Sequence, residues 1–141
     1  MKIQYAYIMQ LGEEPIIKIG VSEQPEYRLK TLRRKAGSQL ELRYVYLHPS
    51  RSHVQAYDNW AYIYLPHYEK SWDLPQITEW YALTPEDALQ KLPQLTDPVF
   101  QSRWVKYQSV EHQIEESAFR RVGEILKAVD ALHKSELVNQ V

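Results

Sequence analysis

The sequence predicts an α+β fold with a small, mostly antiparallel three-stranded sheet, made of a β-hairpin, a helix and a third strand and flanked by further helices. Two observations predict it. Strand-like and helix-like segments alternate in the order β-β-α-β-α-β-α-α, and the first two strand-like segments are close enough for a hairpin. A long C-terminal helix follows. We therefore expect a domain over residues 1–92, and a connector with a helical extension over residues 93–141.

Four segments read as strands. Residues 3–10 and 16–21 are rich in aromatic and β-branched residues, and residues 12–15 between them have the composition of a turn. Residues 39–47 form the clearest strand-like run in the chain. Residues 79–83 read as one more short strand.

Helices are predicted between the strands. The first begins near Pro25, which suits a first helical turn, and ends at Gly37. Residues 51–65 carry apolar side chains at spacings of three and four, as an amphipathic helix does. Thr84 is typical of a helix cap and starts a helix that runs to about Leu92.

The last predicted helix is the longest. From residue 108 to residue 137, apolar residues recur at spacings of three and four along one stripe. Two interpretations remain open: a brace across the domain, or the contact surface of a homo-oligomer.

Composition excludes several classes of function. The formal net charge is −1, so no overall positive field draws the chain to nucleic acid. The chain has no cysteine, which excludes disulfides, thiolate metal sites and cysteine nucleophiles. No apolar run approaches the ~18 residues that span a bilayer, and the N-terminus lacks the apolar core of a signal peptide. We therefore expect a cytoplasmic protein that does not contact a membrane.

Positive charge is nevertheless concentrated in one segment. Its members are Lys30, Arg33, Arg34, Lys35 and Arg43. Such a run is either a solvated helix end or a local binding surface for nucleic acid.

The front of the chain gathers groups that suit phosphate chemistry. Tyr5 and Tyr7 share one face of their strand, and Lys18 and Gly20 share one face of the partner strand. Arg28 flanks the buried stripe of the next helix, and its guanidinium can hold a phosphate through two hydrogen bonds. Phenols that handle a water and cations that neutralise developing charge suit a phosphodiester. The alternative interpretation is ordinary packing and solvated charge.

The order of these residues resembles a known family. The motif residues are Tyr7-Ile8, Lys18-Ile19-Gly20, Ser22, and Arg28-Leu29 with Leu32. They resemble the signature of the GIY-YIG endonuclease superfamily, and within it the T5orf172/MUG113-like branch, whose second motif is commonly Lys-Ile-Gly. Glu79-Trp80-Tyr81 resembles the Glu-Trp-Phe ending of that branch. The resemblance covers roughly residues 3–83.

The resemblance implies roles for the site residues. Tyr7 takes the place of the general base, and Arg28 that of the group that stabilises the transition state. Lys18 stands at the second motif's tyrosine position, where it supports the phosphate or the base, and Tyr5 replaces the first motif's glycine. These four are the candidate catalytic residues. The candidate substrate-binding residues are Gly20, Ser22, Lys30, Arg33 and Arg34.

A divalent ion, Mg²⁺ or Mn²⁺, is implied by the same resemblance. The family holds it with a glutamate on the helix that corresponds to residues 51–65, which contains no glutamate here. Asp58 is the nearest substitute, and its carboxylate oxygens are the type of ligand that Mg²⁺ takes. Glu79 is expected to pair with a basic residue rather than to bind the metal.

The leading hypothesis is therefore a GIY-YIG-like endonuclease, a hydrolase that binds DNA and cuts its phosphodiester bonds with Mg²⁺. A rival hypothesis keeps the fold but loses the cutting, and leaves a protein that binds nucleic acid or a small phosphate-bearing ligand. A third is an assembly module driven by the helix over residues 108–137, which is compatible with either of the others.

Overall fold

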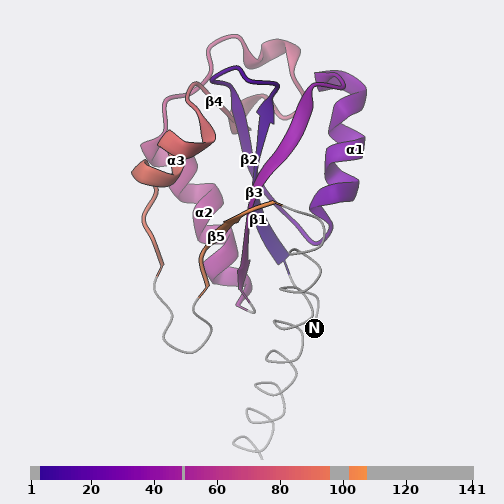
Figure 1. Cartoon of the computed structure of the whole chain (residues 1–141). Helices are drawn as coiled ribbons and strands as arrows, with labels where there is room; N and C mark the ends of the chain where they lie inside the picture. Colours follow the sequence, from indigo (N-terminus) through magenta and orange to yellow (C-terminus); the bar gives the residue numbers. More distant parts are fainter. Residues whose placement is uncertain (1–3, 49, 96–101, 108–141) are drawn as a thin grey trace, which may run out of the picture.

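A computed structural model describes residues 4–48, 50–95 and 102–107. Within those residues, five strands form one antiparallel sheet in the order β4-β2-β1-β3-β5. The strands are β1 (Gln4–Leu11), β2 (Ile17–Ser22), β3 (Leu40–His48), β4 (Trp80–Tyr81) and β5 (Trp104–Lys106). The α-helices are α1 (Pro25–Ala36), α2 (Arg51–Tyr64) and α3 (Pro85–Lys91), and the short 3-10 helices are η1 (Ser71–Asp73) and η2 (Ile77–Glu79). Helix α1 lies on one side of the sheet, and α2 and α3 lie on the other (Figure 1).

The predicted hairpin is confirmed. Strands β1 and β2 pair from Tyr5 opposite Ser22 to Gln10 opposite Ile17. Gly12 begins the turn with a φ of 55°, a left-handed conformation that glycine adopts without steric cost.

The predicted helices of the domain are confirmed, with ends shifted by one residue or so. Helix α1 has Pro25 in its first turn and stops before Gly37, whose φ is 103°. The Thr84 hydroxyl accepts a hydrogen bond from the Asp87 amide at 3.2 Å and caps α3.

Alternation along the strands creates two cores, one on each face of the sheet. The core beneath α1 includes Tyr5, Tyr7, Met9, Leu32, Leu42 and Trp80. The core beneath α2 and α3 includes Ala6, Ile8, Ile19, Val54, Tyr57 and Ala88. The face that carries Tyr7 is therefore the face that the Arg28-bearing helix covers.

The predicted three-stranded sheet is wrong, because both of its edges are extended. Strand β4 adds two residues beside β2, and β5 adds three residues beside β3. Strand β4 lies within the short strand that was predicted over residues 79–83, whereas β5 was not predicted. A run of three residues is too short for alternation to show, and its extended conformation depends on pairing with a distant strand. The predicted long helix over residues 108–137 lies outside the described residues.

Candidate active site

The Tyr7 phenol and the Lys18 ammonium group meet on the face of the sheet that α1 covers. In the β1–β2 ladder, Tyr7 lies opposite Gly20 and Met9 lies opposite Lys18, so these side chains share one face. Lys18 Nζ donates a hydrogen bond of 3.1 Å to the phenol oxygen of Tyr7. Tyr7 is 1% exposed and Lys18 is 0% exposed, so the two polar groups meet inside the core.

Gly20 provides the space for this contact. A Cβ atom at position 20 would lie 2.7 Å from Tyr7 Cζ and 3.1 Å from Lys18 Nζ, with the phenol oxygen closer still. Any side chain there would collide with the phenol. The glycine of the second motif is therefore needed by the Tyr7–Lys18 pair itself.

Glu79 neutralises the buried ammonium group. Its carboxylate forms an ion pair with Lys18, and the Glu79 side chain is 32% exposed. A buried charge is tolerated when it is paired and hydrogen-bonded, and Lys18 has both kinds of contact. The expectation that Glu79 pairs with a basic residue is confirmed. Tyr7, Lys18 and Glu79 thus form a polar chain from the core towards the surface.

A short, tightly bonded turn carries Glu79 into place. Gln76 has a φ of 56° and a ψ of 65°, an uncommon left-handed conformation for a residue other than glycine. Its carbonyl accepts a hydrogen bond of 3.0 Å from the Glu79 amide. The Trp80 indole donates a hydrogen bond of 2.6 Å to the Pro75 carbonyl. Since strain of this kind persists only where the surroundings impose it, the turn fixes the carboxylate beside Lys18.

Asp58 lies on α2, half-buried and within electrostatic reach of this chain of groups. Burial raises the pKa of its carboxyl group, the negative charge of Glu79 raises it further, and the Lys18 ammonium group lowers it. A carboxylate whose pKa is raised by a neighbouring negative charge lies where a cation is stabilised. Their oxygen atoms are the ligand type that Mg²⁺ takes. Among the described residues, no group of three His, Cys, Asp or Glu side chains could hold a metal ion.

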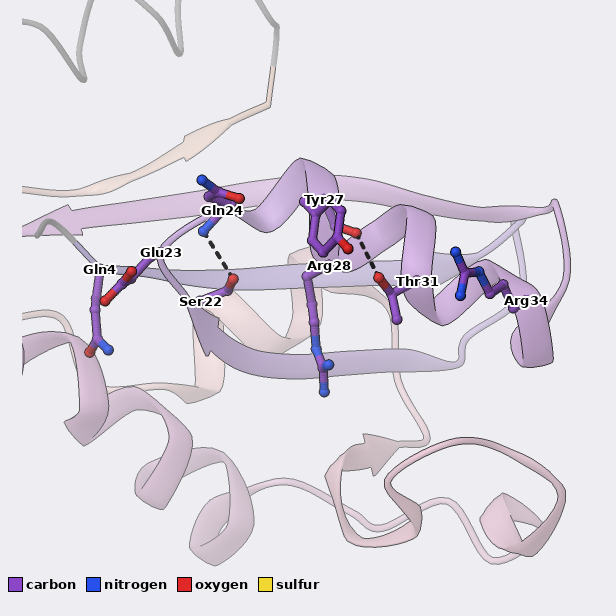
Figure 2. A pocket seen from close by; sticks show the side chains of 8 residues that line it. All are labelled: Gln4, Ser22, Glu23, Gln24, Tyr27, Arg28, Thr31 and Arg34. Carbon is purple, nitrogen blue, oxygen red and sulfur yellow. Dashed lines mark hydrogen bonds between the residues drawn. The ribbon is translucent and has the colours of Figure 1, made fainter.

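Arg28 lies on α1 and lines a hollow of about 530 Å³. Ser22 at the end of β2 and Tyr27, Thr31 and Arg34 on α1 line the same hollow (Figure 2). The Arg28 side chain extends away from the helix, and no hydrogen bond or ion pair holds its guanidinium within the described part of the chain. Helix and hollow belong to the face of the sheet that carries Tyr7. The hydrogen bonds and the ion pair of Tyr7 and Lys18 within the described residues do not include Arg28.

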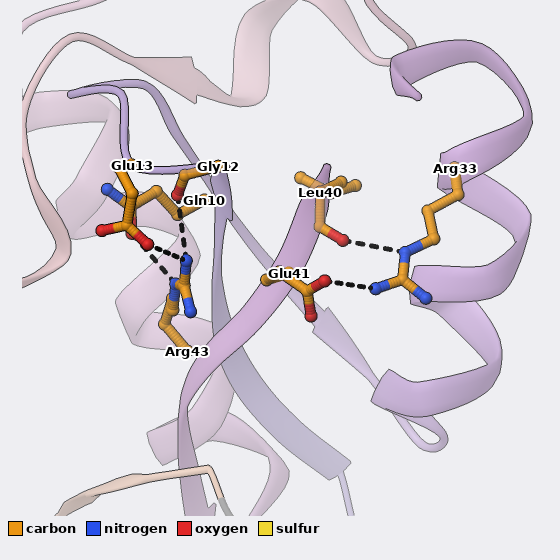
Figure 3. A network of polar contacts seen from close by, with 7 residues as sticks. All are labelled: Gln10, Gly12, Glu13, Arg33, Leu40, Glu41 and Arg43. Atoms are coloured by element: carbon orange, nitrogen blue, oxygen red, sulfur yellow. Dashed lines mark hydrogen bonds and ion pairs between the residues drawn. The ribbon is translucent and has the colours of Figure 1, made fainter. Parts of the chain in front are cut away.

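The basic segment divides into engaged and unengaged side chains. Arg33 and Arg43 are engaged on both sides of β3 (Figure 3). Arg33 donates to the Leu40 carbonyl at 2.8 Å and pairs with Glu41 at 3.0 Å. Arg43 contacts Gln10, Gly12 and Glu13 around the hairpin turn. Lys30 and Arg34 are exposed on α1.

Tyr5 and Ser22 lie opposite one another at the far end of the hairpin. Tyr5 is almost fully buried in the core beneath α1, two residues along the strand from Tyr7. The Ser22 hydroxyl oxygen accepts a hydrogen bond of 3.0 Å from the Gln24 amide at the start of α1. Ser22 therefore joins the strand end to the helix that carries Arg28.

Sequence reasoning missed Tyr81 and the rings around it. Burial raises the pKa of the Tyr81 phenol well above its usual value, and the charges of Asp58 and Glu79 raise it further. The His67 ring lies 5.3 Å from the Tyr81 ring and 4.8 Å from the Tyr62 ring. The aromatic pair after Glu79 was the signal available in the sequence. Tyr81 bounds the carboxylate pair as a neutral phenol.

The comparisons with known proteins agree with the motif order. The sequence model of the T5orf172 domain matches residues 4–96, which is most of the described part of the chain. The chain belongs to the T5orf172 domain family. The match begins at the first residue of β1 and includes β4 and α3, so it covers every residue of the site described above. No curated protein and no solved structure matches the chain.

In residues 4–48, 50–95 and 102–107, no helix of this T5orf172 domain is long and apolar enough to cross a membrane.

Proposed function

We propose that this T5orf172 domain is an endonuclease that hydrolyses DNA phosphodiester bonds with a divalent metal ion, Mg²⁺ or Mn²⁺. The observation that carries the proposal is the Tyr7–Lys18 hydrogen bond over Gly20, with Glu79 behind it. A cationic donor aimed at the phenol oxygen stabilises negative charge there when Tyr7 takes part in proton transfer. Family membership supports the same assignment.

The other residues of the chain have separable tasks in this proposal. Arg28 binds the scissile phosphate, because its guanidinium offers two parallel donors and no protein group in the described residues occupies them. Glu79 pairs with Lys18 and holds it in place. Ser22, Lys30, Arg33 and Arg34 are proposed to contact the DNA strand, and Tyr5 to support Tyr7 from the same strand. Gly20, first expected to bind substrate, is instead proposed to leave room for the Tyr7–Lys18 contact.

Asp58 is the residue proposed to hold the metal ion, which when bound polarises the phosphate and lowers the pKa of a bound water. Its carboxylate fits this task in chemistry and in its negative surroundings. Mg²⁺ commonly keeps several waters and takes one or two carboxylates from the protein, so a cluster of three side chains is not required.

Plasmid nicking tests the proposal. Wild-type protein is expected to nick supercoiled DNA with Mg²⁺ or Mn²⁺ and not with EDTA. Arg28→Ala is expected to lose about 10²–10³-fold in rate, the cost of removing one transition-state donor. Arg51→Ala, which removes an exposed arginine from α2, is the matched control and should cut at the wild-type rate. Equal cutting by wild type and Arg28→Ala would refute the catalytic assignment.

A second candidate function is DNA or phosphate binding without cleavage. Two observations favour it: Tyr7 and Lys18 are buried, and the metal-binding position carries an aspartate, one methylene shorter than the glutamate of the resembling family. Asp58→Glu separates the candidates. A higher cutting rate in that variant supports a weakened enzyme, whereas salt-dependent DNA binding with no cutting in either protein supports a binder.

We also propose that the segment over residues 108–137 forms a homo-oligomer. Because β5 ends at Lys106 and pairs with β3, a chain shortened after Tyr107 keeps all five described strands. Light scattering should give a larger mass for the full chain than for the shortened one. Two monomers would exclude this role.

A further inference from the structure

The hollow in front of α1 combines positive charge with an exposed aromatic ring. Tyr27 is 66% exposed, and it shares one helix face with Thr31 and Arg34, four and seven residues further on. Figure 2 shows these three side chains along the helix and Arg28 extending from it. Thr31 donates to the Tyr27 backbone carbonyl at 3.1 Å, and within the described residues no hydrogen bond or aromatic contact holds the Tyr27 side chain.

Negative and positive side chains are separated along the hollow. Gln4 and Glu23 lie at one end of the hollow and Arg34 lies at the other, with Arg28 in the middle (Figure 2). Unlike Arg33 and Arg43, neither Arg28 nor Arg34 is held by a protein acceptor in the described part of the chain. An anion is therefore stabilised towards the arginine end.

A volume of about 530 Å³ is in the ordinary range for sites that bind small organic groups. A phenol ring that offers one open face suits stacking against a nucleobase, and stacking accepts any base sequence. An adjacent guanidinium suits the phosphate that such a base carries. Both features are present on one face of α1.

We propose that this hollow binds one unpaired nucleotide of a DNA strand, with its base stacked on Tyr27 and its phosphate held by Arg34. The inference rests on the proposed function, because Arg28 at the same hollow is the group assigned to the scissile phosphate. The stacked nucleotide then lies next to the bond that is cut. The substrate class is accordingly DNA with a single-stranded or opened segment at the cleavage site.

Fluorescence anisotropy of a labelled single-stranded oligonucleotide tests this site on the full chain. The titration is done in EDTA, so that binding is measured with no cutting. Tyr27→Ala is expected to weaken binding roughly 5- to 150-fold, the range for the loss of one base–aromatic stack. Tyr27→Phe keeps the ring and should bind as wild type does. Arg34→Ala should reduce the slope of log affinity against log salt by about 0.7, the value for one phosphate contact on a single strand.

Matched controls come from α2. Tyr64→Ala removes another exposed tyrosine, and Arg51→Ala another exposed arginine, and both should retain wild-type affinity. A blunt duplex should bind Tyr27→Ala and wild type equally, since its bases are not available for stacking. Wild-type affinity of Tyr27→Ala for the single strand, or an equal loss in Tyr64→Ala, overturns the proposal. Failure to nick plasmid contradicts the nuclease assignment alone, because the binding assay does not depend on cutting.

Discussion

A methyl group at position 20 would collide with the Tyr7 phenol, and Gly20→Ala therefore perturbs the proposed site through a single added carbon. The added Cβ would lie 2.7 Å from Tyr7 Cζ and 3.1 Å from Lys18 Nζ. Since ordinary contacts of a Cβ atom are 3.4–4 Å, the ring must move away. Tyr7 is only 1% exposed, so this movement is resisted by the packed core beneath α1.

Two magnitudes follow from that geometry. Overpacking a close-packed core by one methyl group costs about 1–3 kcal/mol of unfolding free energy. Displacing a reacting group by about 1 Å can cost roughly 10²-fold in rate. The structure therefore predicts a moderate loss of stability together with a large loss of cleavage, measured under conditions in which the variant is still folded.

The assay is a double-mutant cycle with Gly20→Ala and Tyr7→Phe, read by urea unfolding and by plasmid nicking. If the methyl group acts through the phenol oxygen, Gly20→Ala should lower the nicking rate much less in the Tyr7→Phe background, where that oxygen is already gone. Its cost in stability should also shrink there, because the closest clash is removed. Unchanged stability and nicking in Gly20→Ala, or losses that are fully additive with Tyr7→Phe, would refute the reasoning.

Two further predictions concern groups on the α1 side of the sheet. Lys18→Met keeps the apolar length of the side chain but removes the donor to Tyr7, so nicking should fall by about 10²-fold or more. Since Glu79 is one-third exposed and can be hydrated, the unfolding free energy should change by only about 1–2 kcal/mol. A change in stability without a change in nicking would contradict the role of Lys18. Burial, together with a hydrogen bond to Glu26 and the charge of that residue, raises the pKa of Tyr107 to about 12. Its contribution to stability is therefore complete below pH 10 and is lost as the pH rises through about 12. Glu26→Gln should lower that pKa, which NMR of labelled tyrosine rings can measure, with Tyr107→Phe to assign the signal.

Periodicity in the sequence predicted the elements that have enough residues to show it. The hairpin, the strand that follows α1 and the three α-helices of the described residues lie within one or two residues of the predicted ranges. Each of them buries its own apolar face, so local pattern and tertiary packing agree. Strands β4 and β5 have two and three residues, and their pairing partners lie far away in the sequence. The short strand predicted over residues 79–83 contains β4, whereas nothing in the three residues of β5 distinguishes an edge strand from a loop.

The sequence predicted the residues of the candidate site better than it predicted the contacts among them. Motif spacing selected Tyr7, Lys18, Gly20 and Arg28, and the structure brings the first three into contact. The identity of the partner of Lys18 was not available from spacing, because Glu79 lies 61 residues away in sequence and reaches it through a strained turn. The contacts of Arg33 with β3 could not be predicted either. A run of basic residues has the same composition whether its side chains meet the sheet or the solvent.

The Lys18–Glu79 pair also limits how the site can bind a metal ion. A buried ammonium group needs a counter-charge, so Glu79 is committed to Lys18 and has less negative charge to offer a cation. In the proposed metal site, Asp58 would then supply the principal carboxylate, in surroundings that Glu79 still makes negative. Lys18→Met should release Glu79 from its partner, and the two carboxylates together should bind Mn²⁺ more tightly than in the wild type even though cleavage is lost. Isothermal titration with Mn²⁺ measures this, and an unchanged or weaker affinity in Lys18→Met would show that Glu79 and Asp58 do not share a cation.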